Sequence, residues 1–485
     1  MKILMLASEA EPYSKTGGLA DVVGSLSRTL AGLGHQLGVV LPLYQETAPL
    51  LAKRRVSTIH ESLAIPLGKD IRNVGIRQVD EGGVSWFFVD DEEYFDRPGL
   101  YGTPAGDHAD NPQRFTTLVR AALAIAAADF PADVLHCHDW QTGLAPALIK
   151  SGLAPGVPPG KLPVLFTIHN LGYDGLYPPA VLRELGLPDE LFQVDGLEFF
   201  GKVSFLKGGL LYSDKVSTVS EAYSREILTP EYGLGKEGIV IRRQADLLGI
   251  LNGVDYAVWN PERDPLIAAR YSADDLSGKR QCKHDLLEQM GLPVSEIDLP
   301  LIGIVSRLAW QKGLDIVAEA ADQIVELGVM LVVLGSGEAA LEKRFARWSE
   351  RLPERIAARL AYDNRLAHKI EAGADIFLMP SRYEPCGLNQ MYSLKYGTVP
   401  IVRATGGLLD TVQPWDPKTW QGNGFHLSDD APESLVEAVK DALAVYKNRD
   451  AWSVIMRNGM MQDYSWARSA GKYVQVYREL ASSGS

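Results

Sequence analysis

Short apolar runs alternate with helical patterns along this chain, and no other feature restricts its fold as strongly. In the first half, the runs that predict strands occupy residues 3–7, 38–42, 86–90, 133–139, 163–170 and 216–220, and helical patterns such as 114–129 and 140–151 lie between them. Strands that alternate with helices form a parallel sheet covered on both faces. The first half is therefore predicted to be a doubly wound α/β domain.

The same alternation begins again in the second half, with predicted strands at 300–306, 330–337, 374–381 and 398–403. A chain of 485 residues also exceeds what one hydrophobic core usually serves. We therefore predict two such domains, at 1–258 and 259–465, and a helical stretch at 466–485 that packs back on the first domain. Further predictions are a buried helix at 202–211, a short strand with a turn at 249–255, a linker at 256–275 and a helix at 277–290.

Several predicted strands end in polar residues. Ser8 and Glu9 follow the first strand, Asp139 follows His138, and Asn170 follows His169. In open α/β sheets, ligands bind beyond the carboxyl ends of the strands. A single histidine in such a place is more often structural, but three polar endings at one edge favour a functional site.

A glycine pair lies between the first strand and the first helical pattern. Gly17 and Gly18 follow Lys15 and precede apolar residues spaced for one helix face, Val22, Val23, Leu26, Leu30 and Leu33. Adjacent glycines let a backbone approach a ligand closely, and a helix N-terminus favours anions. A plain strand-to-helix turn remains the alternative. The stretch is neither a P-loop nor a dinucleotide fingerprint.

Composition excludes some classes of partner. The net charge of −13 does not favour nucleic acid or an acidic membrane, and no run is long enough to span a bilayer. The three cysteines, Cys137, Cys282 and Cys386, are far apart, which indicates a reducing compartment rather than a disulfide framework or a zinc site. The first strand begins at once, so we expect no signal or transit peptide.

The motifs of the whole chain, taken in order, resemble those of the bacterial glycogen synthases and plant starch synthases. Each motif is only moderately specific, but the ordered set is very specific and extends from Met1 to the C-terminus. The motifs are Lys15-Thr16-Gly17-Gly18-Leu19-Ala20-Asp21, His138-Asp139-Trp140, Thr167-Ile168-His169-Asn170, Asn252-Gly253-Val254-Asp255, Ser306-Arg307-Leu308, Glu384-Pro385-Cys386-Gly387-Leu388 and Arg403-Ala404-Thr405-Gly406-Gly407.

The resemblance implies a fold and an activity. The fold of this family is GT-B, two Rossmann-like doubly wound α/β domains facing a deep cleft. Its reaction transfers glucose from ADP-glucose to the non-reducing 4-hydroxyl of an α-1,4-glucan, with retention of configuration and release of ADP. The resemblance implies no metal and no other cofactor, and it implies glycogen or a malto-oligosaccharide as acceptor. With the unextended N-terminus it favours a bacterial cytoplasm. It does not define an oligomeric state.

The resemblance also assigns roles in the second domain. Arg307 and Lys312 match the pair that holds the diphosphate, and Glu384 matches an acid near the hydroxyls of the donor sugar. Fixed cations would stabilise the charge that develops on departing ADP. The remaining donor contacts implied are Cys386, Gly387 and Leu388 through backbone N–H groups, Thr405, Gly406 and Gly407 in a phosphate-facing turn, and Tyr362 beside the adenine. Cys386 has no evident base nearby, so we interpret it as a packed thiol.

In the first domain, Lys15 matches the nucleotide-sugar lysine beside Gly17 and Gly18. The sugar-site positions are Asp139, His169, Asn170 and Asn252, and Asp21 is expected to cap or orient the first helix. Glu9 and Tyr101 are candidate acceptor contacts. The predicted catalytic set is therefore Arg307, Lys312, His169, Glu384 and Asp139.

Other interpretations make different demands on the sequence. Many retaining enzymes of this architecture have a second glutamate eight residues after the first; Tyr392 stands there, as in the synthases. A glucan phosphorylase needs a pyridoxal-phosphate lysine motif, and a dehydrogenase needs G-x-G-x-x-G; neither stands out. A UDP-sugar donor and a non-catalytic glucan-binding protein stay open. Retention is compatible with same-face attack, which we favour, or with a covalent intermediate on Asp139.

Overall fold

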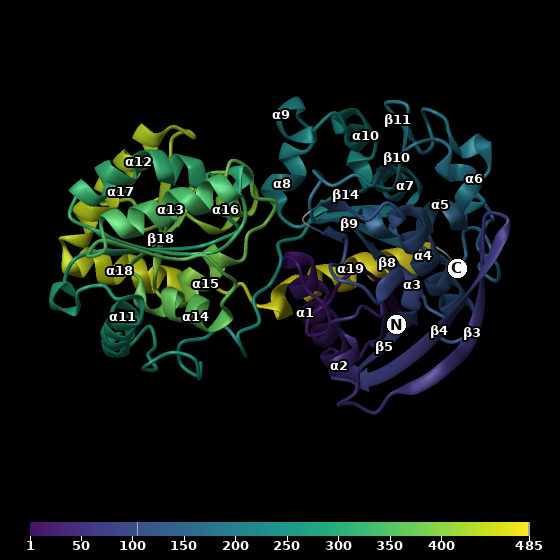
Figure 1. Cartoon of the computed structure of the whole chain (residues 1–485), viewed down its shortest axis with the longest axis horizontal. Helices are drawn as coiled ribbons and strands as arrows, with labels where there is room; N and C mark the ends of the chain where they lie inside the picture. The colour runs from purple at the N-terminus through teal and green to yellow at the C-terminus, as the bar shows by residue number, and fades with distance from the viewer. Residues whose placement is uncertain (104, 484–485) are drawn as a thin grey trace. The chain divides into compact units, whose positions relative to one another are not determined.

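The computed structural model describes residues 1–103 and 105–483. Its contacts divide the chain into two compact units, each described by itself below (Figure 1). Unit 1 consists of Met1–Gly253 together with the segment that begins at Trp466, and unit 2 is Val254–Ser465. The contacts place the boundary after Gly253, five residues before the predicted boundary after residue 258. The last helix, α19 (Trp466–Ser483), belongs to unit 1.

The main sheet of unit 1 has the strand order β14-β13-β9-β8-β1-β2-β5-β4-β3. Each apolar run predicted to be a strand lies in it, with bounds that differ by a few residues. The strands are β1 (Lys2–Leu6), β2 (Gln36–Pro42), β3 (Ser57–Leu67), β4 (Asp70–Glu81), β5 (Val84–Asp90), β8 (Val134–His138), β9 (Val164–Ile168), β13 (Lys215–Thr218) and β14 (Leu247–Gly249).

The prediction of a parallel sheet is confirmed for the centre of unit 1 and wrong for one edge. β1 pairs in parallel with β2 and β8, and the parallel pairing continues through β9, β13 and β14. The hairpin of β3 and β4 is antiparallel, and β4 pairs antiparallel with β5. Most of β3 is exposed or half-buried. A strand that faces water need not be continuously apolar, so no apolar run marked it.

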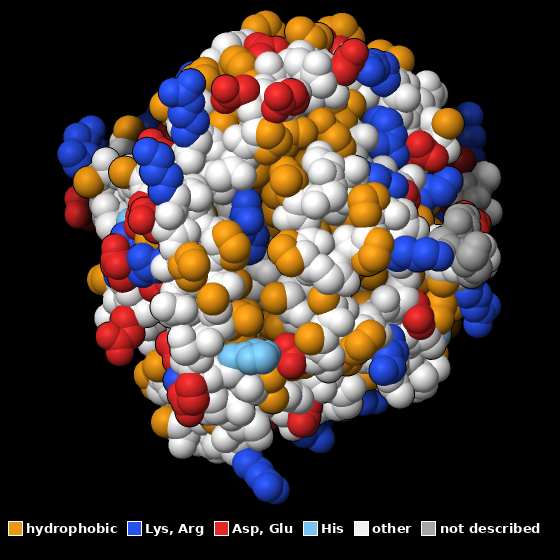
Figure 2. All heavy atoms as spheres, turned by 90° about the vertical axis from the view of Figure 1, so that its right-hand side faces the viewer, with side chains coloured by type: hydrophobic (Ala, Val, Ile, Leu, Met, Phe, Trp, Pro, Cys, Tyr) orange, Lys and Arg blue, Asp and Glu red, His pale blue; other side chains and the backbone are white. Residues whose placement is uncertain are grey.

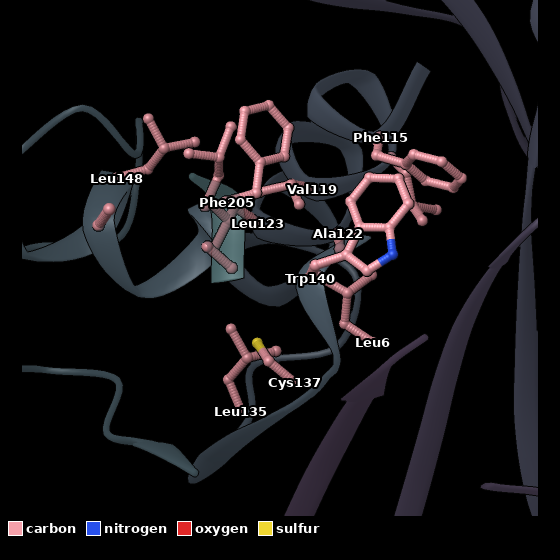
Figure 3. Packing of buried hydrophobic residues seen from close by; sticks show 14 of the residues in the cluster. Leu6, Phe115, Val119, Ala122, Leu123, Leu135, Cys137, Trp140, Leu148 and Phe205 are labelled. Carbon is pink, nitrogen blue, oxygen red and sulfur yellow. The ribbon is translucent and has the colours of Figure 1, made fainter. Parts of the chain in front are cut away.

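The helices of unit 1 pack on this sheet, and residues of both form the large hydrophobic cluster of the unit. In Figure 3, Leu135 and Cys137 of β8 lie near Leu6 of β1, while Trp140 lies beside Phe115. The helices are α1 (Gly18–Gly32), α2 (Ala48–Leu51), α3 (Glu92–Phe95), α4 (Asn111–Ala127), α5 (Leu144–Lys150), α6 (Val181–Leu185), α7 (Phe205–Tyr212), α8 (Glu221–Glu226), α9 (Pro230–Gly233), α10 (Glu237–Arg242) and α19.

One predicted helix begins later than expected. Residues Lys202–Ser204 form β12, in a small antiparallel sheet with β10 (Leu176–Tyr177) and β11 (Glu198–Phe199). Helix α7 starts at Phe205 because the hydroxyl of Ser204 accepts a hydrogen bond from the Lys207 N–H and caps it. The prediction at 202–211 was therefore wrong for its first three residues. A two-stranded ribbon, β6 (Gly102–Thr103) and β7 (Gly106–Asp107), completes the strands of this unit.

Unit 2 contains the second predicted sheet, parallel throughout, in the order β17-β16-β15-β18-β19-β20. Its strands are β15 (Leu301–Val305), β16 (Met330–Leu334), β17 (Ile356–Arg359), β18 (Ile376–Met379), β19 (Val399–Arg403) and β20 (Phe425–Leu427). Its helices are α11 (Ser277–Met290), α12 (Leu314–Glu326), α13 (Ala339–Arg351), α14 (Asn364–Gly373), α15 (Asn389–Lys395), α16 (Gly406–Thr411), α17 (Pro432–Tyr446) and α18 (Arg449–Met460). The helix predicted at 277–290 is confirmed.

The surface and the cysteines can be compared with the composition of the chain. On the face drawn in Figure 2, lysines and arginines are interspersed with acidic side chains rather than gathered in one basic area. Within residues 1–103 and 105–483, no helix is long and apolar enough to cross a membrane. Cys137, Cys282 and Cys386 are buried and form no disulfide among the described residues.

Candidate active site

The order of the strands in unit 1 brings the predicted first-domain residues to one edge of the sheet. The chain places β2 on one side of β1 and β8 on the other, so the topological switch lies at β1. Glu9 follows β1, Asp139 follows β8, and His169 follows β9. Ligands of such sheets bind beyond the carboxyl ends of the strands at this point. These side chains therefore stand where a ligand of unit 1 is expected.

Asp139 is held in an unusual backbone conformation. Its φ of 58° is positive, which is costly for a residue other than glycine and is found most often at functional sites. Its carboxyl Oδ1 accepts hydrogen bonds from the backbone N–H groups of His169 (2.7 Å) and Asn170 (3.5 Å). Burial nevertheless raises the pKa of Asp139 to about 7. The carboxyl thus joins two strand ends and titrates near neutral pH.

His169 is directly linked to a second histidine. Its Nε2 lies 3.0 Å from Nδ1 of His138, the last residue of β8. Burial lowers the pKa of His169 to about 3. His169 is therefore a neutral imidazole at neutral pH, able to donate or accept a hydrogen bond without carrying charge.

Glu9 is buried and connects the end of β1 to the loop that precedes α1. Its Oε2 accepts hydrogen bonds from the N–H (2.6 Å) and the hydroxyl (2.7 Å) of Thr16. Burial raises the pKa of Glu9 to about 7. Tyr101, the other predicted acceptor contact, shares a 2.8 Å hydrogen bond with the hydroxyl of Ser8. Both candidates therefore lie at the carboxyl end of β1.

The glycine turn leads directly into α1. Gly17 is the N-cap residue, with an extended φ of −157°, so a positive φ is not what requires glycine there. Asp21 makes no capping hydrogen bond; its Oδ1 lies 2.6 Å from Nζ of Lys15 instead. Of the two roles expected for Asp21, it does not cap the helix; it lies in the first turn of α1, where its carboxylate holds the Lys15 ammonium. Gly18 begins the helix.

The two predicted asparagines differ in their surroundings. Asn252 is buried, and its Oδ1 has no hydrogen-bond partner among the described residues. Buried polar atoms are normally satisfied, so this oxygen is available to a ligand. Asn170 accepts a hydrogen bond from Gly172 N–H through its own Oδ1 (2.9 Å), a local turn.

Unit 2 brings its predicted residues together in the same way. The chain order switches between β15 and β18, which are neighbours in the sheet. Lys312 follows β15 and Glu384 follows β18, and the Lys312 Nζ lies 2.6 Å from the Glu384 Oε2. Ser381 donates a further hydrogen bond (3.0 Å) to that oxygen. The structure therefore joins the predicted diphosphate lysine and the predicted sugar-site acid in one largely buried ion pair.

A second cation, Arg382, connects the two loops that carry this pair. Its guanidinium donates to both carboxyl oxygens of Asp315 (2.7 and 2.8 Å) and to the carbonyl of Trp310 (2.7 Å). Its backbone N–H donates to the carbonyl of Gln311 (2.9 Å). A planar fork that binds a carboxylate through two bonds fixes geometry as well as charge. Arg382 was not predicted from the sequence, although it directly precedes the Tyr383-Glu384 pair.

The glycine turn of unit 2 packs against the Glu384 motif. A Cβ on Gly406 would meet the Glu384 carbonyl oxygen at 2.0 Å, and one on Gly407 would meet the Cys386 carbonyl oxygen at 2.0 Å. The Gly407 N–H donates to the Glu384 carbonyl (3.1 Å). Close backbone approach therefore explains both glycines. Thr405, the N-cap of α16, is buried.

Of the other predicted donor contacts of unit 2, two side chains are exposed and two residues lie in the turn that leads into α15. Arg307 is exposed after β15, and Tyr362 is 79% exposed on the loop between β17 and α14. Gly387 adopts a positive φ of 71°, and Leu388 is the N-cap of α15. No group of three or more His, Cys, Asp or Glu side chains arranged to hold a metal ion occurs in the described parts of the chain.

Two doubly wound sheets, with cations, buried carboxyls and glycine turns at their switch points, define a glycosyltransferase of the GT-B class. The starch synthase catalytic domain family matches residues 2–242, and glycosyl transferases group 1 matches residues 294–458. Glycogen synthase of Koribacter versatilis is 50% identical over 99% of this chain and 98% of its own. The chain belongs to the glycogen and starch synthase family, as its motifs predicted.

Further relatives agree over the full length. Glycogen synthase of Syntrophotalea carbinolica is 46% identical over 99% of both chains. Among solved structures, the catalytic domain of starch synthase IV from Arabidopsis thaliana, bound to ADP and acarbose, matches with a TM-score of 0.89 and 31% identity over 99% of both chains. These matches confirm the predicted GT-B fold and glycogen or starch synthase function.

Proposed function

We propose that this protein transfers glucose from ADP-glucose to the non-reducing 4-hydroxyl of an α-1,4-glucan, with retention of configuration and release of ADP. The observation that carries the proposal is the largely buried pair of Lys312 and Glu384 at the switch point of unit 2. The Lys312 ammonium lies 2.6 Å from the Glu384 carboxylate, which supports a role for the lysine at the diphosphate and for the acid at the sugar hydroxyls.

The cations serve the leaving group. Breaking the bond between glucose and phosphate puts negative charge on ADP, and Lys312 with Arg307 would stabilise that charge as it develops. Preorganised donors aimed at developing charge contribute about 3–4 kcal/mol each. Lys15, oriented by Asp21 at the start of α1, is proposed to bind the same donor.

Unit 1 would supply the sugar contacts. Neutral His169 can hydrogen-bond a glucose hydroxyl, and the unpaired Oδ1 of Asn252 can accept one. We propose that the acceptor hydroxyl attacks on the face from which ADP leaves and that the departing phosphate takes its proton. Asp139, the rival nucleophile, already accepts two backbone hydrogen bonds through Oδ1, which suits hydroxyl binding better than attack.

Donor choice is tested by nucleoside diphosphate release from ADP-glucose and from UDP-glucose, each with and without glycogen. ADP-glucose is favoured because a starch synthase of this family binds ADP. We expect ADP release that depends on glycogen. Release from UDP-glucose alone would keep the fold and change the donor. Glycogen binding without release from either donor would support a glucan-binding protein instead.

We further propose that the reaction uses no metal ion, because Arg307 and Lys312 would supply the positive charge that the diphosphate needs. Release of ADP should therefore be unchanged in EDTA. Activity that EDTA abolishes and Mg²⁺ restores would contradict this part of the proposal and leave the donor assignment intact.

A further inference from the structure

Two buried histidines of β8 lie on the face of the sheet that α19 covers. His136 and His138 are two residues apart, so they point to the same face, while Cys137 points into the opposite cluster (Figure 3). Both imidazoles are completely buried. A strand buried on both faces is normally apolar throughout. Two imidazoles in its interior therefore need a reason.

The histidines belong to one chain of contacts that runs from α19 to His169. The Tyr477 hydroxyl lies 2.8 Å from Nδ1 of His136, whose Nε2 lies 2.7 Å from the Thr167 hydroxyl. The rings of His136 and His138 pack with centroids 4.0 Å apart. Nδ1 of His138 then lies 3.0 Å from Nε2 of His169.

We infer that Tyr477 of α19 positions the imidazole of His169 through His136 and His138, while the hydrogen bond from His138 sets which His169 nitrogen carries the proton. The hydrogen bonds at both His136 nitrogens fix the plane of that ring, and the His138 ring packs directly against it. These three residues are positioning residues; the part that concerns turnover rests on the proposed role of His169.

The hydrogen-bond partners of each ring nitrogen determine where the protons of His138 and His169 lie. Nε2 of His138 is buried with no partner among the described residues. A buried N–H without an acceptor is rare, so this nitrogen carries the lone pair. The proton of His138 then lies on Nδ1 and is donated to Nε2 of His169. His169 consequently carries its own proton on Nδ1, where it is a donor for a ligand. Burial lowers the pKa of all three histidines, which keeps the chain neutral.

The position of α19 on unit 1 is fixed by contacts in the turns of the helix that precede Tyr477. The Ser469 hydroxyl donates to the Leu251 carbonyl (2.6 Å), and Lys472 pairs with Glu221 (2.7 Å). These contacts hold Tyr477 in place, so its hydroxyl meets His136 at a fixed position. The last helix of the chain thus contributes to the histidine cluster of unit 1, whose other residues come from the first half.

The test compares Tyr477→Phe with Tyr473→Phe. Tyr473 lies one turn earlier on α19, and its ring packs beside His136 with centroids 5.6 Å apart, so its variant controls for loss of a buried phenol. The readouts are the imidazole nitrogen signals in ¹⁵N–¹H NMR spectra of the ¹⁵N-histidine-labelled full chain, and kcat and KM for the donor.

We expect Tyr477→Phe to shift or broaden the His169 signals away from a single Nδ1–H tautomer and to lower kcat by about 10-fold with a smaller change in KM, because small misplacements of reacting groups cost up to about 100-fold. Tyr473→Phe should change neither. Unchanged His169 signals in Tyr477→Phe, or equal effects of both variants, would overturn the inference. The NMR result stands even if the proposed donor is wrong.

A second pair of variants tests the middle of the chain. In His138→Asn, the side-chain amide replaces Nδ1 and can still donate to His169, whereas His138→Leu cannot. We expect the Asn variant to keep the Nδ1–H tautomer of His169 and most of kcat, and the Leu variant to lose both. Equal behaviour of the two variants would show that the hydrogen bond has no positioning role.

Discussion

At the scale of single residues, burial rather than charge pairing sets the chemistry of unit 1. Asp139 and Glu9 have their pKa values raised to about 7, and burial is the largest cause for each. The negative charge of Glu9 also raises the pKa of Asp139, because the two carboxylates repel one another. Both groups therefore titrate in the range in which the enzyme is expected to work.

The raised pKa of Asp139 predicts how stability depends on pH. A carboxyl with a higher pKa in the folded than in the unfolded chain stabilises the fold fully below pH ~4 and loses that contribution as pH rises to about 7. A rise of the pKa from its ordinary value to about 7 corresponds to about 4 kcal/mol. Urea unfolding at pH ~4 and pH ~7.5 should show a free energy of unfolding that falls less in Asp139→Asn than in the parent chain. The same fall in both chains would contradict the assignment.

Lys312 gives a prediction for turnover. Lys312→Ala removes the proposed leaving-group cation and takes away the ion-pair partner of the buried Glu384. We expect kcat to fall by about 100- to 1,000-fold, the effect of losing one preorganised donor, in a glycogen-dependent ADP release assay. Lys440→Ala, which removes an exposed lysine paired with Glu437, is the control. A loss below about 10-fold would show that Lys312 does not act on the leaving group.

At the scale of elements, Arg382 holds the loops that follow β15 and β18 in a fixed position relative to each other. Arg382→Lys keeps the charge but cannot bind both oxygens of Asp315. We expect a loss of about 10-fold or more in kcat, because Lys312 is displaced from its productive position, with a small change in the melting temperature. Arg280→Lys, at an exposed pair with Asp298, should leave kcat unchanged. Parental kcat in Arg382→Lys would show that the loops are held in place without this fork.

The glycine turn of unit 2 gives a prediction for stability. In Gly407→Ala the new methyl group would lie 2.0 Å from the Cys386 carbonyl oxygen, so the turn must separate from the Glu384 motif. Overpacking of this kind costs about 1–3 kcal/mol. Calorimetry should show a lower unfolding temperature for Gly407→Ala and no such decrease for Gly471→Ala, where nothing lies within 4 Å of the added Cβ. A melting temperature equal to the parent's would contradict the packing argument.

The alternation of apolar runs predicted the parallel strands well because those strands are buried on both faces. The run at 163–170 became β9, and the helix at 277–290 was predicted to the residue. The β3–β4 hairpin was missed because many of its residues are exposed. Polar residues at these positions interrupt the apolar run that marks a buried strand. Helix α7 begins at Phe205, three residues after the predicted start, because the hydroxyl of Ser204 caps it there.

The candidate site was predictable where a residue follows a strand, as Glu9, Asp139, His169 and Lys312 do. It was not predictable where a contact joins distant parts of the chain. Nothing in the spacing of Tyr477 shows that it meets His136, a residue 341 positions earlier. Nor does the sequence show that Asp21 turns to Lys15 rather than to the helix N-terminus, because both partners are near in the chain.

At the scale of the whole molecule, the two units are proposed to carry complementary parts of one reaction. Unit 1 carries Lys15, Asp139 and His169, and unit 2 carries Arg307 and the Lys312–Glu384 pair. The family membership extends over 99% of the chain, so both units belong to the part of the chain that the relatives share. The central proposal is that the fixed cations Lys15, Arg307 and Lys312 act on the nucleotide of the donor without a metal ion.

Isothermal titration calorimetry of ADP in EDTA tests this proposal most directly. We predict that one ADP binds per chain and that Lys15→Ala and Arg307→Ala each weaken binding by about 10-fold or more, since a charge-assisted hydrogen bond contributes about 1.5–3 kcal/mol. Lys440→Ala should bind ADP as the parent chain does. Parental affinity in either Lys15→Ala or Arg307→Ala, or binding that requires added Mg²⁺, would contradict the proposal.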